Sequence, residues 1–111
     1  MQKISEEEFL SAVKYNTDGL VPVIAQQFDS KEVLMMAWAN EEALRETLQT
    51  RRMCYFSRSR RQLWRKGETS GHTQKLVEMR IDCDGDTLLA LIDQTGAACH
   101  TNNRTCFYRK V

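Results

Sequence analysis

The sequence predicts a mainly β, α+β fold, in which a rolled or two-sheet β core carries two short helices. Short segments rich in aromatic and aliphatic residues alternate with turn signals along most of the chain, a pattern typical of β-strands. Only two segments combine a capping residue with the apolar spacing of a helix. With 111 residues, of which 41% are hydrophobic, the chain suffices for one core, so we expect a single domain over residues 1–111.

The N-terminal part is expected to form a helix followed by a β-hairpin. Ser5 and Glu8 have the spacing of a capping box at the start of SEEEFLSAV. Two apolar, β-rich runs follow at residues 20–28 and 32–39, with polar residues between them. We expect the Met and Trp side chains of the second run to lie in the core, because strands of this composition are usually buried.

A second helix and five further strands are predicted after the hairpin. Asn40 is suited to cap a helix over residues 41–49, whose Leu44 and Leu48 share one face. The strands are predicted at short segments rich in aromatic or aliphatic residues, with turn signals between them. These segments are residues 53–59, 62–66, 73–82, 87–94 and 106–110.

The charge is small overall but unevenly distributed. The formal net charge is +1, yet the segment from Arg51 to Lys66 holds seven basic residues and no acid. This segment predicts an anion-binding face, with Arg51 and Arg52 as ordinary solvated surface. No apolar run is long enough to cross a bilayer and no signal peptide precedes the domain. We therefore expect a cytoplasmic protein with no membrane partner and reduced cysteines.

Three aspartates occupy alternate positions at Asp82, Asp84 and Asp86. On an extended backbone they would project to one side and Cys83 to the other. Clustered carboxylates need a cation among them, and magnesium is the common cation that takes carboxylate oxygens. The alternative is that Asp84 and Gly85 form a tight hairpin turn with acids at its ends. The spacing alone leaves both interpretations open.

The cysteines indicate a metal site of unusual spacing. Cys83, Cys99 and Cys106 include no C-x-x-C pair, so a shared site must be assembled from separate strands or chains. Three thiolates would leave the fourth position of tetrahedral zinc for water, as in a catalytic site. If His100 filled that position, the site would be structural instead. Cys54, inside a strand-like segment, is interpreted as a buried small hydrophobe.

Several long segments resemble one enzyme family. SRSRRQLWRKGETSGHTQ, IDCDGDTLLALIDQ and ACHTNNRTCFYR are similar to the signature segments of the phosphoribosyl-AMP cyclohydrolases of histidine biosynthesis, and GLVPVIAQ with EVLMMAWANEEAL resembles their N-terminal portion. In many relatives a phosphoribosyl-ATP pyrophosphohydrolase domain follows. Because the chain ends at Val111, we expect the cyclohydrolase alone.

The resemblance implies metals, an assembly and a reaction. It implies an intertwined homodimer in which Cys83 of one subunit meets two cysteines of the other. The implied reaction breaks the N1–C6 bond of the adenine ring of 1-(5-phosphoribosyl)-AMP, with zinc-bound hydroxide attacking C6 and His72 or His100 as general base. The implied metal ligands are Cys83, Cys99 and Cys106 for zinc, and Asp82, Asp84 and Asp86 for magnesium.

The segment before the acids is expected to bind the substrate. The phosphates of the substrate would be held by basic side chains and by hydroxyl donors. Trp64 would either stack on the purine or lie in the core. Asn102 stands where relatives often have Gly, and Asn tolerates a positive φ. A zinc-stabilised nucleic-acid module that uses residues 51–66 is the alternative, but the acids would repel a phosphate backbone, so no nucleic-acid partner is expected. The candidate phosphate-binding residues are Arg58, Arg60, Arg65, Lys66, Thr69 and Ser70.

Overall fold

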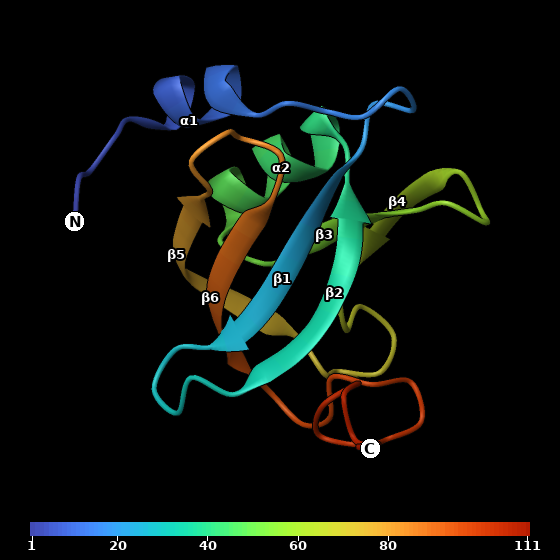
Figure 1. The fold of residues 1–111 in the computed structure, drawn as a ribbon. Helices are drawn as coiled ribbons and strands as arrows, with labels where there is room; N and C mark the ends of the chain where they lie inside the picture. The colour runs from blue at the N-terminus through green and yellow to red at the C-terminus, as the bar shows by residue number, and fades with distance from the viewer.

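The computed structural model describes all residues 1–111 and contains two helices and six strands in two sheets (Figure 1). This confirms the predicted mainly β, α+β class with a two-sheet core. Neither helix has the length and apolar character needed to span a bilayer. The elements are α1 Glu6–Ala12, β1 Val21–Gln27, β2 Val33–Ala39, α2 Glu41–Thr50, β3 Cys54–Ser57, β4 Gln62–Arg65, β5 Gln74–Ile81 and β6 Leu88–Gln94.

The larger sheet has the strand order β2-β1-β6-β5, and β3 and β4 form a separate two-stranded sheet. β1 with β2 and β5 with β6 are antiparallel hairpins, whereas the two central strands β1 and β6 run parallel. Parallel strands end at the same edge of a sheet, so the segments that follow β1 and β6 leave from one end of the molecule. Figure 1 shows the C-terminal segment at that end and the β5–β6 turn at the other.

Both predicted helix caps are confirmed. The Ser5 hydroxyl accepts a hydrogen bond from the Glu8 backbone N–H at 3.0 Å, and the Asn40 side chain accepts one from the Ala43 N–H at 2.8 Å. α2 ends at Arg51, whose φ of 62° is left-handed and whose N–H donates to the Thr47 carbonyl. These local signals set the helix boundaries, because each cap satisfies a backbone group that the helix itself leaves unpaired.

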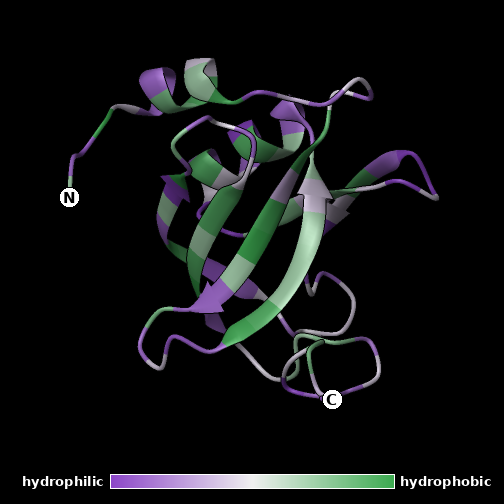
Figure 2. Ribbon diagram, viewed as in Figure 1, coloured by the Kyte–Doolittle hydropathy of each residue, from purple (hydrophilic) through white to green (hydrophobic).

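The core lies between α2, β3 and the larger sheet, with alternate residues of β1 turned into it. Figure 2 shows hydrophobic residues concentrated on the central strands and hydrophilic residues on the turns. Cys54 is fully buried in this core, and its burial raises the pKa of the thiol to about 12. The prediction that Cys54 acts as a small hydrophobe is therefore confirmed.

The predicted strand at residues 106–110 is wrong. The chain after β6 forms turns and an irregular segment, joined to the start of β2 by the Cys106 N–H, which donates to the Leu34 carbonyl at 2.7 Å. The Thr105 hydroxyl donates a hydrogen bond to the neighbouring Val33 carbonyl at 2.8 Å. Phe107 is 61% exposed, so the aromatic residues that suggested a strand gain no burial from pairing.

The expectation that every Met and Trp of β2 lies in the core is also wrong. Met35 is buried, but Met36 is 45% exposed and Trp38 is only half-buried. The physical reason is that β2 is an edge strand that is only partly covered: Leu34, Met35 and Ala39 are buried, whereas Val33 and Met36 are exposed. A run without polar residues is not evidence that both faces are buried.

Candidate active site

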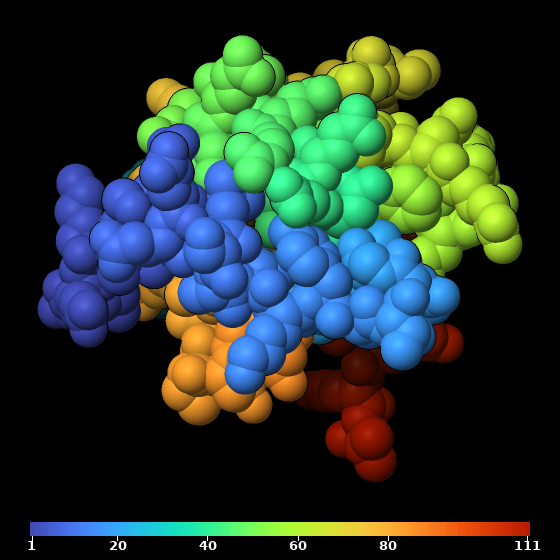
Figure 3. Space-filling view, turned by 90° about the horizontal axis from the view of Figure 1, so that it is seen from above, coloured from blue at the N-terminus to red at the C-terminus, as the bar shows by residue number.

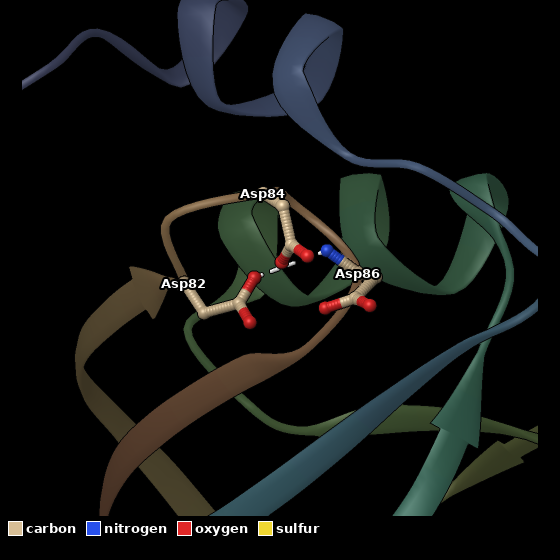
Figure 4. A group of neighbouring side chains, drawn as sticks. All are labelled: Asp82, Asp84 and Asp86. Carbon is tan, nitrogen blue, oxygen red and sulfur yellow. Dashed lines mark hydrogen bonds between the residues drawn. The ribbon is translucent and has the colours of Figure 1, made fainter.

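The three aspartates converge on the turn between β5 and β6. One oxygen atom from each of Asp82, Asp84 and Asp86 lies within 4.8 Å of the others (Figure 4). The Asp82 Oδ1 accepts from the Asp86 N–H at 3.1 Å, and the Gly85 N–H donates to the Asp82 carbonyl at 3.2 Å. The hairpin-turn interpretation is correct, and the extended backbone assumed for the alternation is wrong. The turn, rather than a pleat, gathers the carboxylates.

The carboxylates perturb one another as closely spaced acids should. Asp84 and Asp82 raise the pKa of Asp86. Desolvation raises the pKa of Asp82, but interactions with Asp86 and Asp84 and with the Thr87 N–H outweigh it and hold that pKa below its usual range. A cation would relieve this repulsion, and oxygen-only ligands are those that magnesium prefers. The donor set therefore fits magnesium.

The acidic turn is held against the end of α1. Gly85 has a φ of +80°, and a Cβ atom there would lie 2.3 Å from the Ala12 carbonyl oxygen. The Lys14 N–H donates to the Gly85 carbonyl at 2.8 Å. Figure 3 shows the N-terminal segment lying against the β5–β6 turn. Only glycine allows this close approach in a left-handed conformation.

Cys99 and Cys106 lie together in the segment that follows β6. The Ala98 N–H donates to the Arg104 carbonyl at 3.0 Å, and the Asn102 N–H donates to the Cys99 carbonyl at 3.0 Å, which closes a compact turn. Asn102 has a φ of 71°, as its tolerance of the left-handed region predicted. We call residues 97–106 the cysteine loop. It supplies two of the three predicted zinc ligands.

The two thiols of the cysteine loop have different environments. The Thr101 hydroxyl donates to the Cys99 sulfur at 3.0 Å and lowers the pKa of that thiol. Burial and the nearby Cys99 raise the pKa of Cys106 to about 11. The Lys66 ammonium donates to the Ala98 carbonyl at 2.6 Å, and its charge favours the thiolate form of both cysteines. Two adjacent sulfur atoms beside a cation fit a soft metal such as zinc.

Cys83 lies far from the other two cysteines of its own chain. It belongs to the acidic turn before β6, whereas the cysteine loop follows β6. A strand of seven residues spans about 20 Å. The only three His, Cys, Asp or Glu side chains that are close enough to hold one ion are the three aspartates. One chain alone therefore does not assemble the three predicted zinc ligands.

The two histidines differ in how firmly they are held. His100 is exposed on the cysteine loop. His72 is half-buried, and a Cβ atom on Gly96 would lie 2.6 Å from its Cδ2 atom, so the imidazole packs on that glycine. A Cβ atom on Gly67 would lie 2.4 Å from the His72 carbonyl carbon. His72 is thus packed against Gly96 through its ring and against Gly67 through its backbone, next to the cysteine loop.

Sequence comparison identifies the family. Residues 35–108 match the profile of the phosphoribosyl-AMP cyclohydrolases. The chain belongs to this family. A phosphoribosyl-AMP cyclohydrolase of Alkalilimnicola ehrlichii is 67% identical over 102 residues, which cover 92% of this chain and 72% of that protein. Enzymes of the same name from Rhodospirillum rubrum and Acidiphilium cryptum are 66% and 63% identical, over 91% and 92% of this chain and 71% and 88% of their own lengths.

The cyclohydrolase match contains every residue of the predicted site. It extends from β2 through the acidic turn and the cysteine loop, and it includes all four cysteines and both histidines. The predicted resemblance is confirmed. The family is one of hydrolases of histidine biosynthesis, which agrees with the class of enzyme expected from the sequence.

The predicted substrate-binding residues of this cyclohydrolase chain occupy three different settings. Arg58 lies over the Trp38 ring at 5.1 Å, and Arg60 is exposed in the β3–β4 turn. Arg65 is engaged by Glu46, whose carboxylate accepts from it at 2.7 and 2.8 Å. Lys66 lies beside the cysteine loop, as described above. The basic segment is therefore not one continuous face.

The remaining predicted residues lie on or near the loop that carries His72. Thr69 is exposed, and the Ser70 hydroxyl accepts from the His72 N–H at 3.2 Å. Trp64 contacts Tyr55, with ring centroids 5.4 Å apart and planes tilted by 40°, and the Lys66 ammonium lies 5.5 Å from the centroid of its ring. Because Trp64 is 39% exposed, it is not a core residue.

Two features of this region were not predicted from the sequence. Arg52, expected to be ordinary surface, lines a hollow of about 510 Å³ together with Arg65, Lys66 and Thr73. Arg51 is exposed and pairs with Glu6 at 3.2 Å, as expected for surface. Gln74 and Gln94 were not singled out, although both are buried. No sequence signal set them apart, because their strands also contain charged residues, Lys75, Glu78 and Arg80 in β5 and Asp93 in β6.

Proposed function

We propose that this chain hydrolyses the N1–C6 bond of the adenine ring of 1-(5-phosphoribosyl)-AMP, in homodimers whose two chains complete each active centre. The observation that carries the proposal is the match to the cyclohydrolases over residues 35–108, with all predicted ligands retained. The separation of Cys83 from the cysteine loop within one chain supports the dimeric arrangement.

The metal ligands would come from both chains. Cys99 and Cys106 would hold zinc together with Cys83 of the partner subunit, and the three aspartates would hold magnesium. A bound zinc ion would lower the pKa of a coordinated water and so supply a nucleophile near neutral pH. The Thr101 hydroxyl and, more weakly, the Lys66 charge lower the pKa of Cys99, whereas at Cys106 the Lys66 charge only partly offsets a pKa raised to about 11.

The remaining chemistry is proton transfer by the chain's own residues. Water adds its oxygen to C6, the C6–N1 bond breaks, and the oxygen becomes the C6 carbonyl, so two protons leave the water: one is returned to N1 and the other is released to a base. An imidazole is suited to both steps because its ordinary pKa lies near neutral pH. We assign the transfer to His72 or His100. The contacts of His72 with two glycines support a fixed position for it.

The substrate phosphates would be held by the basic side chains around the loop of His72. The hollow lined by Arg52 and Lys66 also contains Glu46 and Glu68, with Glu46 paired to Arg65, so Arg52 and Lys66 are the cations left for a phosphate there. Arg58 and Arg60, on the β3–β4 hairpin, would reach the second phosphate, with Thr69 and Ser70 as hydroxyl donors. The exposed part of Trp64 would stack on the purine, which requires the Lys66 ammonium over its ring to move aside.

The direct test is turnover of phosphoribosyl-AMP, followed by the absorbance change on ring opening. We expect activity with the zinc-loaded protein, loss of activity with a chelator, and recovery when zinc and magnesium are returned. Single-stranded RNA at low salt serves as the comparison ligand and should not bind. RNA binding without turnover would refute the proposal and favour the nucleic-acid module.

A further inference from the structure

A chain of buried side-chain hydrogen bonds connects the core to the candidate site. The Tyr55 hydroxyl donates to the Gln74 Oε1 at 2.6 Å, and the Gln74 Nε2 donates to the Gln94 Oε1 at 2.8 Å. Tyr55 and Gln74 are fully buried, and Gln94 is 7% exposed. Because its oxygen is engaged on the core side, the Gln94 amide directs its nitrogen toward the loops beyond β6.

The Gln94 amide nitrogen contacts both loops of the candidate site. It donates to the Thr95 carbonyl at 3.0 Å, and it lies 3.4 Å from the His72 carbonyl and 3.5 Å from the Ala97 carbonyl. All three partners are acceptors, which independently fixes the orientation of the amide. One side chain thus joins the loop that carries His72 to the start of the cysteine loop.

A second contact joins the same two loops. The Thr95 N–H donates to the Thr73 carbonyl at 3.0 Å, and the His72 ring rests on Gly96, whose φ of +72° turns the backbone under it. The position of the imidazole is therefore set by the segment 95–97, and Gln94 holds that segment. An apolar residue of the same size at position 94 would fill the space but would not hydrogen-bond the carbonyls and hold their orientation.

We propose that Gln94 is a positioning residue that holds His72 in register with the cysteine loop. This inference rests on the proposed function, in which His72 and the cysteine loop serve one reaction. Gln94 has no titratable group and does not itself move protons. It acts by fixing the carbonyls of both loops. The distance between the His72 imidazole and the metal ligands then stays constant.

The test compares Gln94→Leu with Gln27→Leu. Gln27 is 5% exposed, accepts from the Gln94 backbone N–H at 2.9 Å and donates to Asp93 at 3.0 Å, but bonds neither loop. Both variants lose a buried amide, so both should melt at lower temperature. We expect kcat to fall about 10- to 100-fold in Gln94→Leu with KM little changed, since displaced reacting groups cost rate. In Gln27→Leu, kcat should stay close to that of the wild type.

A second readout is independent of activity. The chain has two histidines, so proton NMR shows two imidazole Cε1–H signals, and a His72→Asn variant assigns them. The chemical shift of the His72 signal should change in Gln94→Leu and stay in place in Gln27→Leu. Unchanged kcat together with an unchanged His72 signal in Gln94→Leu would overturn the proposal.

A glycine pair covers the case in which Gln94→Leu does not fold. Gly96→Ala would place a Cβ atom 2.6 Å from the His72 ring, whereas Gly19, with a similar φ of +74°, has nothing within 4 Å of such an atom. Gly96→Ala should shift the His72 signal and lower kcat, and Gly19→Ala should do neither. Equal behaviour of the two variants would overturn the proposal. A wild-type protein without turnover, with the His72 shifts as expected, would instead refute the proposed function alone.

Discussion

Single residues of one type have different roles here because their surroundings differ. Cys54 is enclosed by the core, and its backbone N–H is bound by the Thr47 hydroxyl at 2.9 Å. Its raised pKa keeps the thiol protonated and inert at neutral pH. Cys99 instead accepts the Thr101 hydroxyl, which lowers its pKa. The environment therefore distinguishes a packing cysteine from a metal ligand.

We expect Cys99→Ser to abolish turnover and to lower bound zinc, because a neutral hydroxyl replaces a thiolate poorly. Cys54→Ala is the matched control. It should keep its zinc and its turnover while losing about 1–3 kcal/mol of unfolding free energy from the cavity. Zinc content by atomic absorption and denaturant unfolding measure both effects. Full activity of Cys99→Ser would show that the zinc assignment is wrong.

We expect Asp84→Asn to weaken the dependence of activity on magnesium and to leave the zinc content near normal. Asn keeps the size of the side chain, so the turn that carries Cys83 should be retained, while one of the three charges is lost. A magnesium titration of activity and a zinc assay on the same sample test this. Equal loss of both metals would indicate one shared cluster or an unfolded turn.

At the scale of elements, the sequence predicted what local signals determine. The helix caps at Ser5 and Asn40 were predicted correctly, because each depends on residues within one turn. The strands up to β6 were predicted within one or two residues, because their apolar patterns are continuous. The parallel pairing of β1 with β6 joins segments far apart in the chain, and no local pattern encodes it. The prediction of a strand at 106–110 was wrong because strand pairing depends on contacts with distant segments, and the aromatic residues of this segment remain exposed.

The site was predictable as a set of residues but not as a geometry. The alternation of acids and the cysteine spacing identified candidate ligands from their chemistry. The sequence offered the turn at Asp84 and Gly85 as one of two interpretations and did not decide between them. It did not indicate that Cys99 and Cys106 share one loop, because that loop depends on backbone hydrogen bonds between its own residues. The role of Gln94 depends on contacts with three carbonyls that no sequence pattern specifies.

The contact between α1 and the acidic turn gives a prediction at this scale. Gly85→Ala would place a Cβ atom 2.3 Å from the Ala12 carbonyl oxygen, so the turn must move away from α1. The left-handed backbone alone costs about 1–2 kcal/mol, which Gly19→Ala should also show. We expect Gly85→Ala to lose more unfolding free energy than Gly19→Ala and to bind magnesium more weakly. Equal losses in denaturant unfolding would mean that the contact is unimportant.

At the scale of the whole molecule, the two halves of the proposed zinc site lie at opposite ends of β6. Cys83 is exposed on the acidic turn and Cys106 is exposed at the end of the cysteine loop, so both are accessible to another chain. Met36, Phe107 and Tyr108 expose large apolar side chains that a partner would bury. These features support the proposed homodimer, in which two-fold symmetry would create two composite sites.

Subunit mixing tests this central claim most directly. Cys83→Ala and Cys106→Ala proteins, each expected to be inactive alone, are refolded together in equal amounts, and phosphoribosyl-AMP turnover is measured. In a mixed dimer one site carries both defects, while the other combines an intact Cys83 with intact Cys99 and Cys106 of the partner chain. Random pairing makes about half of the dimers mixed, so activity should return to about a quarter of that of the wild type. If mixing restores no activity, the zinc ligands do not come from two chains and the shared site is wrong.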